Sequence, residues 1–271
     1  MLKIYSRIWF PYLDFIQQAI LNTLYLKALV LRYARQVTKG LTPDHPSEGT
    51  LLYGQLDEPE ILFTEHGVHF KANVIKGHKT GFFLDHRHNR LAVQKLSKDK
   101  SVLDVFAYAG GFSVHALCGG AREVTSLDLS KQALELAATN ISLNKVTGKH
   151  LTLKGDAFKI LDKLIGQGKK YDIVIIDPPA FAKAAKEIPT ALKQYERLAQ
   201  LGIKLVASKG DLILASCSSR VRAEDFFVLT RRVIKSQPIR FKEIKRTQHD
   251  IDHPITFKEG AYLKTIFWKQ G

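Results

Sequence analysis

The sequence is short of several residues and patterns that mark whole classes of protein. Only two cysteines occur in 271 residues, Cys118 and Cys217. Their number and spacing suit neither a disulfide framework nor a zinc cluster, so no metal site is predicted, and a reducing cytoplasm fits. The apolar N-terminus is interrupted by polar groups at residues 12–19, and no small-residue cleavage site follows it. The sequence therefore predicts neither a signal peptide nor a membrane span.

Acidic residues are also comparatively few. Forty-one lysines and arginines stand against 26 aspartates and glutamates, which leaves a formal net charge of +15 and an isoelectric point near 9.7. Such a charge concentrates polyanions, so nucleic acid is the natural partner, with a merely basic globular protein as the alternative. Hydrophobic residues make up 45% of the chain, enough to bury one main core and a small accessory lobe.

The first ninety residues fall into two segments. In residues 6–36 apolar side chains recur at helical spacing, which predicts one or two amphipathic helices in an N-terminal segment, 1–45. A linker rich in Pro, Asp, Ser and Gly follows at 41–49. Short strands are predicted at 51–55, 60–64 and 68–74, with a hairpin turn at 65–67. They make residues 46–90 a small β region.

From residue 91 to the C-terminus strands alternate with helices, which defines the main domain, 91–271. Strands are predicted at 102–106, 124–128, 151–154, 173–177, 212–216, 241–247 and 263–268. Helices are predicted at 131–143, 158–166, 190–207 and 223–236. The loop around His253-Pro254, between the last two strands, is too poor in helix formers for a crossover. This order predicts an α/β fold with a doubly wound, seven-stranded Rossmann-like sheet, mostly parallel, whose final strand is antiparallel.

The first strand of this domain enters a helix through a loop that contains two adjacent glycines. Adjacent glycines let the backbone turn tightly and approach a ligand at the carboxyl edge of the sheet. An ordinary strand-to-helix turn is the alternative. The predicted cofactor contacts in this loop are Asp104, Tyr108, Gly110, Gly111 and Phe112.

The next two strands also lead into acidic residues. Asp128, eighteen residues past Gly110 and close to Ser130, could accept hydrogen bonds from ribose hydroxyls. In Asp156-Ala157-Phe158 a carboxylate could meet an adenine amino group while the ring flanks the base, although a helix N-cap explains Asp156 equally well. The chain has no Gly-x-Gly-x-x-Gly loop at this point, so a nucleoside without phosphates fits better than NAD.

The fourth strand leads into Asp177-Pro178-Pro179-Ala180-Phe181, the most specific short motif in the chain. Two prolines stop the backbone from continuing the ladder, which holds the Asp177 side chain rigidly at the sheet edge; the alternative is a turn that simply ends a strand. The fifth strand ends in Ser216-Cys217-Ser218. Neighbouring strands would bring Cys217 close to Asp177.

A thiol beside an acid suggests covalent chemistry on a pyrimidine. Carbon 5 of cytosine attacks a methyl donor only after a nucleophile has added at carbon 6. In this scheme Cys217 adds to carbon 6, Asp177 supports protonation at nitrogen 3, and a base later removes the carbon 5 proton. The alternative is that Cys217 is a small buried hydrophobe. Cys118 lies in a predicted helix and is assigned to packing.

Together these motifs resemble a known family, the class I methyltransferases related to the 23S ribosomal RNA cytosine-5 methyltransferase. The resemblance covers the chain from about residue 51 onward and lies in residues 79–87, 104–113, 177–181, 216–218, 252–254 and 259–264. It implies S-adenosylmethionine as cofactor, with residues 82–87 as a lid over its methionine end. Phe83, Asp85 and Arg87 would then contact the cofactor, as would Asp177.

Members with a cysteine at position 217 resemble cytosine-5 enzymes, whereas a guanine-modifying branch lacks it. This chain departs from the family in three places. Residues 1–36 stand where full-length relatives carry a small RNA-binding domain of β character, and this segment could cover the sheet, form a homodimer contact or be a remnant linker helix. His86 stands where glutamine is common, and Ala180 where lysine or serine is common.

Substrate contacts are assigned beside a flipped base, at Pro178, Pro179, Phe181 and His253, although His253 before a proline fits a turn-stabilising role better. Further basic candidates for an RNA path are Arg231, Arg232, Lys235, Arg240, Lys242, Lys245 and Arg246. A solvated charged face is the alternative for this run.

The leading hypothesis is a cytoplasmic RNA cytosine-5 methyltransferase that acts on ribosomal RNA. One alternative is methylation of a base nitrogen, oriented by Asp177, with Cys217 inert. Another is a noncatalytic RNA-binding module that keeps a cofactor fold, and the intact acidic strand ends count against it. An oxidoreductase is disfavoured because the glycine loop lacks the dinucleotide pattern.

Overall fold

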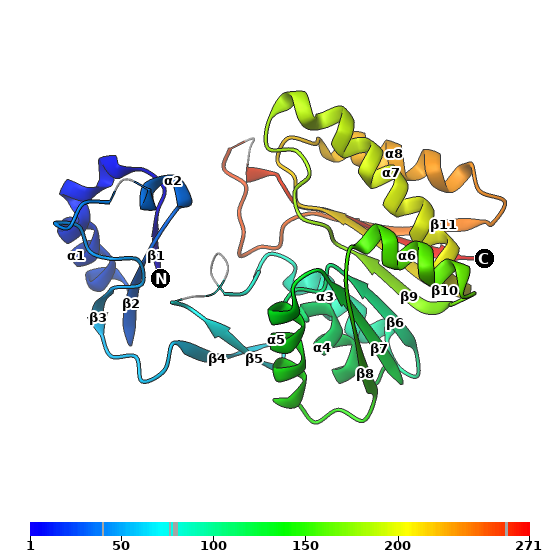
Figure 1. Cartoon of the computed structure of the whole chain (residues 1–271), viewed down its shortest axis with the longest axis horizontal. Coiled ribbons are helices and arrows are strands. Elements are labelled where there is room, and N and C mark those ends of the chain that lie inside the picture. Colours follow the sequence, from blue (N-terminus) through cyan, green and yellow to red (C-terminus); the bar gives the residue numbers. More distant parts are fainter. Residues whose placement is uncertain (40, 76, 78–80, 258–259) are drawn as a thin grey trace. The chain divides into compact units, whose positions relative to one another are not determined.

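A computed structural model describes residues 1–39, 41–75, 77, 81–257 and 260–271 (Figure 1). The chain forms two compact units. The first comprises Met1–Phe63 and Phe70–Phe83, and the second comprises Thr64–His69 and Leu84–Gly271. The boundaries of these units differ from those of the three segments predicted from the sequence, 1–45, 46–90 and 91–271.

The first unit contains a three-stranded sheet in the order β1 (Leu2–Ile4), β2 (Ala28–Tyr33), β3 (Leu51–Gly54). Strand β2 is parallel to β1 and antiparallel to β3. Between the strands lie η1 (Arg7–Tyr12), α1 (Leu13–Thr23) and α2 (Arg35–Thr38). A small core forms from Ile4, Leu31, Tyr33, Ala34 and Val37.

The prediction of helix throughout residues 6–36 is therefore wrong in its second half, where β2 forms. The run Ala28-Leu29-Val30-Leu31 is apolar at every position, so it satisfies a helical period and equally describes a strand buried on both faces. β2 is the central strand of its sheet. Pairing with β1 and β3 makes this run a strand and not a helix.

One hairpin has residues in both units. Strands β4 (Glu60–Glu65) and β5 (Val68–Asn73) form a two-stranded sheet. The turn residues His66 and Gly67 have φ of 49° and 80°, the pair of positive values that a tight two-residue hairpin needs. The predicted hairpin is confirmed.

The second unit is built on a seven-stranded sheet in the order β11-β12-β10-β9-β6-β7-β8. Its strands are β6 (Ser101–Val105), β7 (Glu123–Asp128), β8 (Lys149–Lys154), β9 (Tyr171–Ile176), β10 (Val206–Ser216), β11 (Phe241–Thr247) and β12 (Lys264–Gln270). From β8 to β10 neighbours run parallel, and β12 lies antiparallel between β10 and β11. The predicted doubly wound sheet with an antiparallel final strand is confirmed.

Helices cover both faces of this sheet (Figure 1). They are α3 (Arg87–Leu96), α4 (Gly111–Cys118), α5 (Lys131–Ser142), α6 (Ala157–Gly166), α7 (Ile188–Leu205) and α8 (Ala223–Lys235), with a short η2 (Ala185–Glu187) before α7. Helices α3, α4 and α5 pack in series, as do α6, α7 and α8. The strand order reverses between β6 and β9, which places a ligand crevice at their carboxyl ends.

The central strands are fully buried, and Val174, Ile175 and Ile176 of β9 expose at most 1% of their surface. Such strands read as continuous apolar runs, which is why the sequence located them well. None of the described helices combines the length and apolar character that a membrane span requires.

Candidate active site

The loop after β6 winds tightly. Phe106, Tyr108 and Gly110 have φ of 67°, 47° and 75°, values that only glycine adopts without strain. A Cβ atom at Gly110 would lie 2.7 Å from the Cβ of Ala137 in α5. Glycine is thus required here by packing against α5, whereas the sequence suggested close approach to a ligand. Gly111 begins α4.

Asp128 fixes the shape of this loop from the end of β7. Its Oδ2 accepts a hydrogen bond from the Tyr108 backbone N–H at 2.9 Å, and its Oδ1 accepts one from Ser130 N–H at 2.9 Å. A carboxylate offers about four acceptor positions, so acceptor capacity for two ribose hydroxyls is left. The Ser130 hydroxyl accepts from Ala133 N–H at 3.2 Å and caps α5.

Asp104 lies beneath the loop and does not face the crevice. It is 1% exposed, and its Oδ2 accepts hydrogen bonds from the Ser113 hydroxyl at 2.6 Å and the Ser113 backbone N–H at 3.0 Å. Burial raises the pKa of Asp104 to about 7. Asp104 thus ties β6 to α4 and supports the loop from below, and its direct contact with the cofactor stays a prediction.

The alternative interpretation of Asp156 is confirmed. Its Oδ1 accepts a hydrogen bond from Lys159 N–H at 3.0 Å and caps α6. Ala157 is buried, and the guanidinium of Arg197 lies 4.9 Å from the centre of the Phe158 ring. A contact from Asp156 to adenine stays a prediction, since a carboxylate that caps a helix keeps further lone pairs.

Asp177 follows β9 at the same edge, and a buried histidine contacts it. His86 Nε2 lies 3.4 Å from Asp177 Oδ2. On the other side of the ring, Asn89 Nδ2 lies 3.1 Å from His86 Nδ1 and 3.2 Å from Thr265 Oγ1, while Asn89 Oδ1 accepts from the Thr247 hydroxyl at 2.7 Å. This orientation of the amide makes His86 Nδ1 an acceptor and places the ring proton on Nε2, facing Asp177.

Cys217 lies against the turn that carries Asp177. Its thiol donates to the carbonyl oxygen of Pro178 at an Sγ–O distance of 3.5 Å. The flanking serines anchor the same loop, because the Ser216 hydroxyl donates to Tyr195 Oη at 2.9 Å and the Ser218 hydroxyl to the Ala182 carbonyl at 3.1 Å. The expected proximity of the two motifs is confirmed, since β9 and β10 are hydrogen-bonded neighbours.

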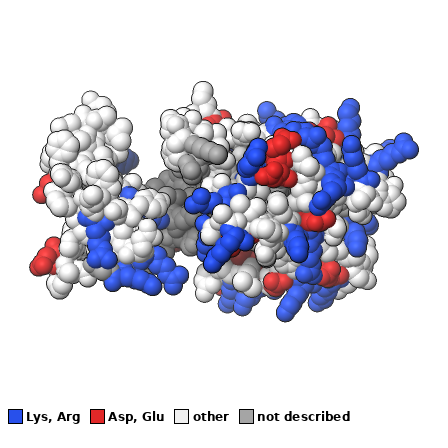
Figure 2. Space-filling view, turned by 90° about the horizontal axis from the view of Figure 1, so that it is seen from above, with Lys and Arg blue, Asp and Glu red and all other residues white. Residues whose placement is uncertain are grey.

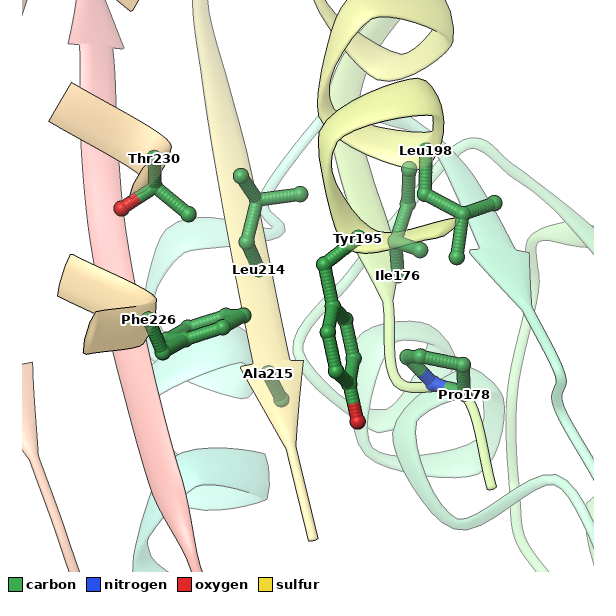
Figure 3. Close-up of a pocket in the computed structure, with 8 residues that line it drawn as sticks. All are labelled: Ile176, Pro178, Tyr195, Leu198, Leu214, Ala215, Phe226 and Thr230. Atoms are coloured by element: carbon green, nitrogen blue, oxygen red, sulfur yellow. The ribbon is translucent and has the colours of Figure 1, made fainter. Parts of the chain in front are cut away.

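Behind this edge lies a small hollow between β10 and helices α7 and α8 (Figure 3). It is lined by Ile176, Pro178, Tyr195, Leu198, Leu214, Ala215, Phe226 and Thr230. Figure 3 shows the Tyr195 side chain between Leu214 and Pro178. The lining is almost wholly apolar, so the hollow supports the position of the Pro178 turn and offers little to a polar ligand.

Lys264 is buried beside the cysteine loop. It is 0% exposed, and its Nζ donates to the carbonyl oxygens of Ser218, Val221 and Tyr262. Burial lowers its pKa to about 8. Three carbonyl acceptors satisfy all three ammonium protons, so one cation holds the backbone on the C-terminal side of Cys217.

A family comparison fits this geometry. The profile of the S-adenosylmethionine-dependent methyltransferases matches residues 41–264. The chain belongs to this family. S-adenosylmethionine is its cofactor and supplies an electrophilic methyl group, and the spare acceptor positions of Asp128 fit the nucleoside part of that molecule.

Relatives of this methyltransferase carry more specific names. It is 38% identical over 98% of its length to "Ribosomal RNA large subunit methyltransferase" of Deinococcus radiodurans, and it spans 65% of that protein. It is 37% identical over 78% of its length to "Ribosomal RNA large subunit methyltransferase I" of Klebsiella pneumoniae, of which it spans 54%. The chain thus covers between half and two thirds of these relatives.

Solved structures show the same fold. A Streptococcus mutans protein assigned to the SAM-dependent methyltransferases superposes with a TM-score of 0.83 at 23% identity, covering 98% of this chain and 68% of that one. A second structure, of SMU.776 complexed with S-adenosylhomocysteine, superposes with a TM-score of 0.82 at 23% identity, covering 98% of this chain and 69% of that one. Both likenesses support the Rossmann-like sheet described above.

The residues predicted to form a lid over the cofactor differ in their contacts. Phe83 belongs to the first unit, and Lys79 and Thr80 of the same motif lie outside the described residues, as does Glu259. Asp85 is buried and accepts a hydrogen bond from the Tyr262 hydroxyl at 2.9 Å. Arg87 forms ion pairs with Asp250 at 2.9 Å and Asp252 at 3.3 Å. A role for these residues in holding the cofactor stays a prediction.

The remaining predicted residues divide between the site and its support. Phe112 is buried and meets the His86 ring edge-on at 5.4 Å. Phe181 is partly buried and packs against Tyr195 with ring centres 5.0 Å apart, and its contact with substrate stays a prediction. Pro179 is exposed. His253 Nδ1 lies 3.0 Å from Asp252 Oδ1 in a turn, as the alternative interpretation expected.

Sequence reasoning missed four polar residues of this methyltransferase site: Asn89, His249, Tyr262 and Lys264. Lys264 is the first residue of β12, and Tyr262 stands two positions before it. Both belong to a motif that the family resemblance had already singled out, and that was the one available signal. Asn89 lies in α3, and its partners Thr247 and Thr265 are 158 and 176 positions away.

Proposed function

We propose that this methyltransferase modifies carbon 5 of cytosine in RNA, with ribosomal RNA as the substrate class, through a covalent bond to Cys217. The observation that carries the proposal is the 3.5 Å contact between Cys217 Sγ and the Pro178 carbonyl. It puts a thiol one residue away from Asp177 at the switch point of the sheet, where ligands bind in this architecture.

In the proposed reaction each group has a separate task. Asp177 lies at the cytosine edge and supports protonation at nitrogen 3, and His86 Nε2 lies 3.4 Å from its Oδ2. Cys217, as a thiolate, adds to carbon 6, and the ring electrons move to carbon 5, which takes up the methyl group. Loss of the carbon 5 proton then restores the ring double bond and expels Cys217.

Charge supports RNA as the substrate. The net charge is +15, and the face of the second unit seen in Figure 2 shows more blue, for Lys and Arg, than red, for Asp and Glu. The two relatives described above are named as ribosomal RNA methyltransferases, which supports this substrate class. The basic run on α8 and β11 contributes less than its sequence suggests, because Arg231 and Arg246 both pair with Glu243 at 3.6 and 2.6 Å. A cytoplasmic location and a homodimer stay predictions.

A trapping experiment tests the proposal. RNA that contains 5-fluorocytidine cannot lose fluorine as a cation, so the intermediate cannot resolve, and wild-type protein with S-adenosylmethionine should form an adduct that survives denaturing gels. The Cys217→Ser variant should form none. Cys118→Ser, the matched control, should behave as wild type because Cys118 is the last residue of α4, away from the strand ends that carry the site. Adduct formation by Cys217→Ser, or full methylation by Cys217→Ala, would overturn the proposal.

A further inference from the structure

The proposed reaction needs a base that has not yet been assigned. After methyl transfer, carbon 5 carries both a hydrogen and the new methyl group. A base must take that hydrogen as a proton, so that the C5–H electron pair forms the C5–C6 double bond and the C6–S electrons return to Cys217. The acceptor must have an unoccupied lone pair and lie in the dry interior beside the reacting ring.

Three buried side-chain atoms around the site make no hydrogen bond within the described part of the chain: Asp85 Oδ1, His86 Nε2 and His249 Nδ1. Two of them are donors. His86 Nδ1 faces the Asn89 amide nitrogen, which leaves the ring proton on Nε2. His249 Nε2 accepts from Leu263 N–H at 3.3 Å, and burial lowers the pKa of His249, so its single proton resides on Nδ1.

Asp85 is the acceptor that remains. The residue is 8% exposed, and its Oδ2 is held by the Tyr262 hydroxyl at 2.9 Å. Burial and the neighbouring carboxylate raise the pKa of Tyr262 above its ordinary value, so the phenol keeps its proton and Asp85 remains the acceptor of the pair. Oδ1 is then a buried carboxylate oxygen with no donor among the described residues.

Contacts link Asp85 to both groups that would hold the cytosine ring, Asp177 and Cys217. On one side it is adjacent in sequence to His86, whose Nε2 lies 3.4 Å from Asp177. On the other side, the carbonyl of its partner Tyr262 shares the Lys264 ammonium with the carbonyl of Ser218, the residue after Cys217. The same buried framework thus carries the nucleophile, the group at the ring edge and the unused carboxylate oxygen.

We propose that Asp85 is the catalytic base that removes the carbon 5 proton, with Tyr262 holding its second oxygen. The proton moves from carbon 5 to Asp85 Oδ1, the C5–C6 double bond forms, and Cys217 leaves carbon 6 as a thiolate. This assignment rests on the proposed cytosine-5 function. It also gives Asp85 a different task from the cofactor contact that the family resemblance implies.

The test uses Asp85→Asn with RNA containing ordinary cytidine and methyl-labelled S-adenosylmethionine. Asparagine keeps the acceptor for Tyr262 but is too weak a base, so methyl transfer should proceed and resolution should stop. Release of 5-methylcytidine should fall about 100-fold or more, and a denaturation-stable protein–RNA adduct carrying the labelled methyl should accumulate. Wild type should show no such adduct with ordinary cytidine.

Three companion variants make the outcome specific. Asp85→Glu keeps a carboxylate and should release product without accumulating adduct. Tyr262→Phe removes only the hydrogen bond to Oδ2, so it should slow release without blocking it. Asp177→Asn should lose methyl transfer and adduct together, because it acts before the covalent step.

Two results would overturn the assignment of Asp85. One is an Asp85→Asn protein that no longer binds S-adenosylhomocysteine in calorimetry, since the residue would then hold the cofactor. The other is Asp85→Asn that binds the cofactor but releases 5-methylcytidine at the wild-type rate or forms no methylated adduct. Failure of the proposed function is recognised separately, because wild type would then form no adduct with 5-fluorocytidine RNA.

Discussion

The carboxyl edge of the seven-stranded sheet has a cofactor half, around Asp104 and Asp128, and a reaction half, around Asp177 and Cys217. The two halves are held by different kinds of contact. On the cofactor half, Asp128 bonds residues 20 and 2 positions away, and Asp104 bonds one 9 positions away. On the reaction half, the hydrogen bonds of Asp85 with Tyr262 and of Asn89 with Thr265 span 177 and 176 positions. Local segments build the cofactor half, whereas the reaction half exists only when the last strand pairs within the sheet.

This difference has a physical consequence. Contacts between distant residues carry a larger loop-closure entropy cost than local ones, so they depend more on cooperative folding of the second unit. Contacts within a strand-loop-helix segment need only that segment. Variants in the two halves should therefore separate cofactor binding from methyl transfer. Substitutions at Asp128 and Asn89 test this separation, and a substitution at Asp104 tests the stability of the cofactor half.

The largest expected effect is on stability, at Asp104. Burial raises its pKa from 3.8 to about 7, so between these values the folded state binds a proton that the unfolded state releases. The stabilisation is present at low pH and is lost as pH rises through 7. From pH 5 to pH 8, wild type should lose about 3 kcal/mol of unfolding free energy relative to Asp104→Asn. Denaturant unfolding of both proteins at the two pH values measures this, and parallel pH profiles would show that Asp104 stays ionised.

A smaller effect is expected at Asp128, within the cofactor half alone. Asp128→Ala removes a charged acceptor for ribose hydroxyls and frees the backbone N–H of Tyr108. Affinity for S-adenosylhomocysteine should fall about 30-fold, equivalent to about 2 kcal/mol, since hydrogen bonds to charged groups contribute on this scale. Calorimetry measures the change. Wild-type affinity in Asp128→Ala would place the ribose elsewhere.

The smallest effect is expected at Asn89, within the reaction half alone. Asn89→Leu removes the amide that fixes the His86 ring, so Asp177 loses its oriented partner. Methyl transfer to RNA should slow about tenfold, and S-adenosylhomocysteine should bind as in wild type. Asn140→Leu offers a matched control, because its side chain bonds the Ala109 carbonyl in the cofactor loop, and it should weaken cofactor binding. If Asn89→Leu lost methyl transfer and S-adenosylhomocysteine binding equally, the two halves would not be separable.

The same contrast explains what the sequence could and could not predict. Asp128 ends an apolar strand, Asp177 follows one directly and Gly110 lies in the loop after one, so local sequence patterns locate all three. The strand β2 was missed because a wholly apolar run has no period to read. Tyr262, Lys264 and Asn89 were missed because their importance comes from partners more than 40 positions away, which no local pattern encodes. For Asp104 the pattern found the residue but not its burial.

Nucleoside analysis of the product tests whether Cys217 takes part in methylation of carbon 5 of cytosine. RNA treated with S-adenosylmethionine and either wild type or Cys217→Ala is digested to nucleosides and analysed by mass spectrometry, after calorimetry has shown equal S-adenosylhomocysteine affinity in the two proteins. Wild type should yield 5-methylcytidine, and the variant should yield none. A methyl group on a base nitrogen, or an equal yield from Cys217→Ala, would contradict it.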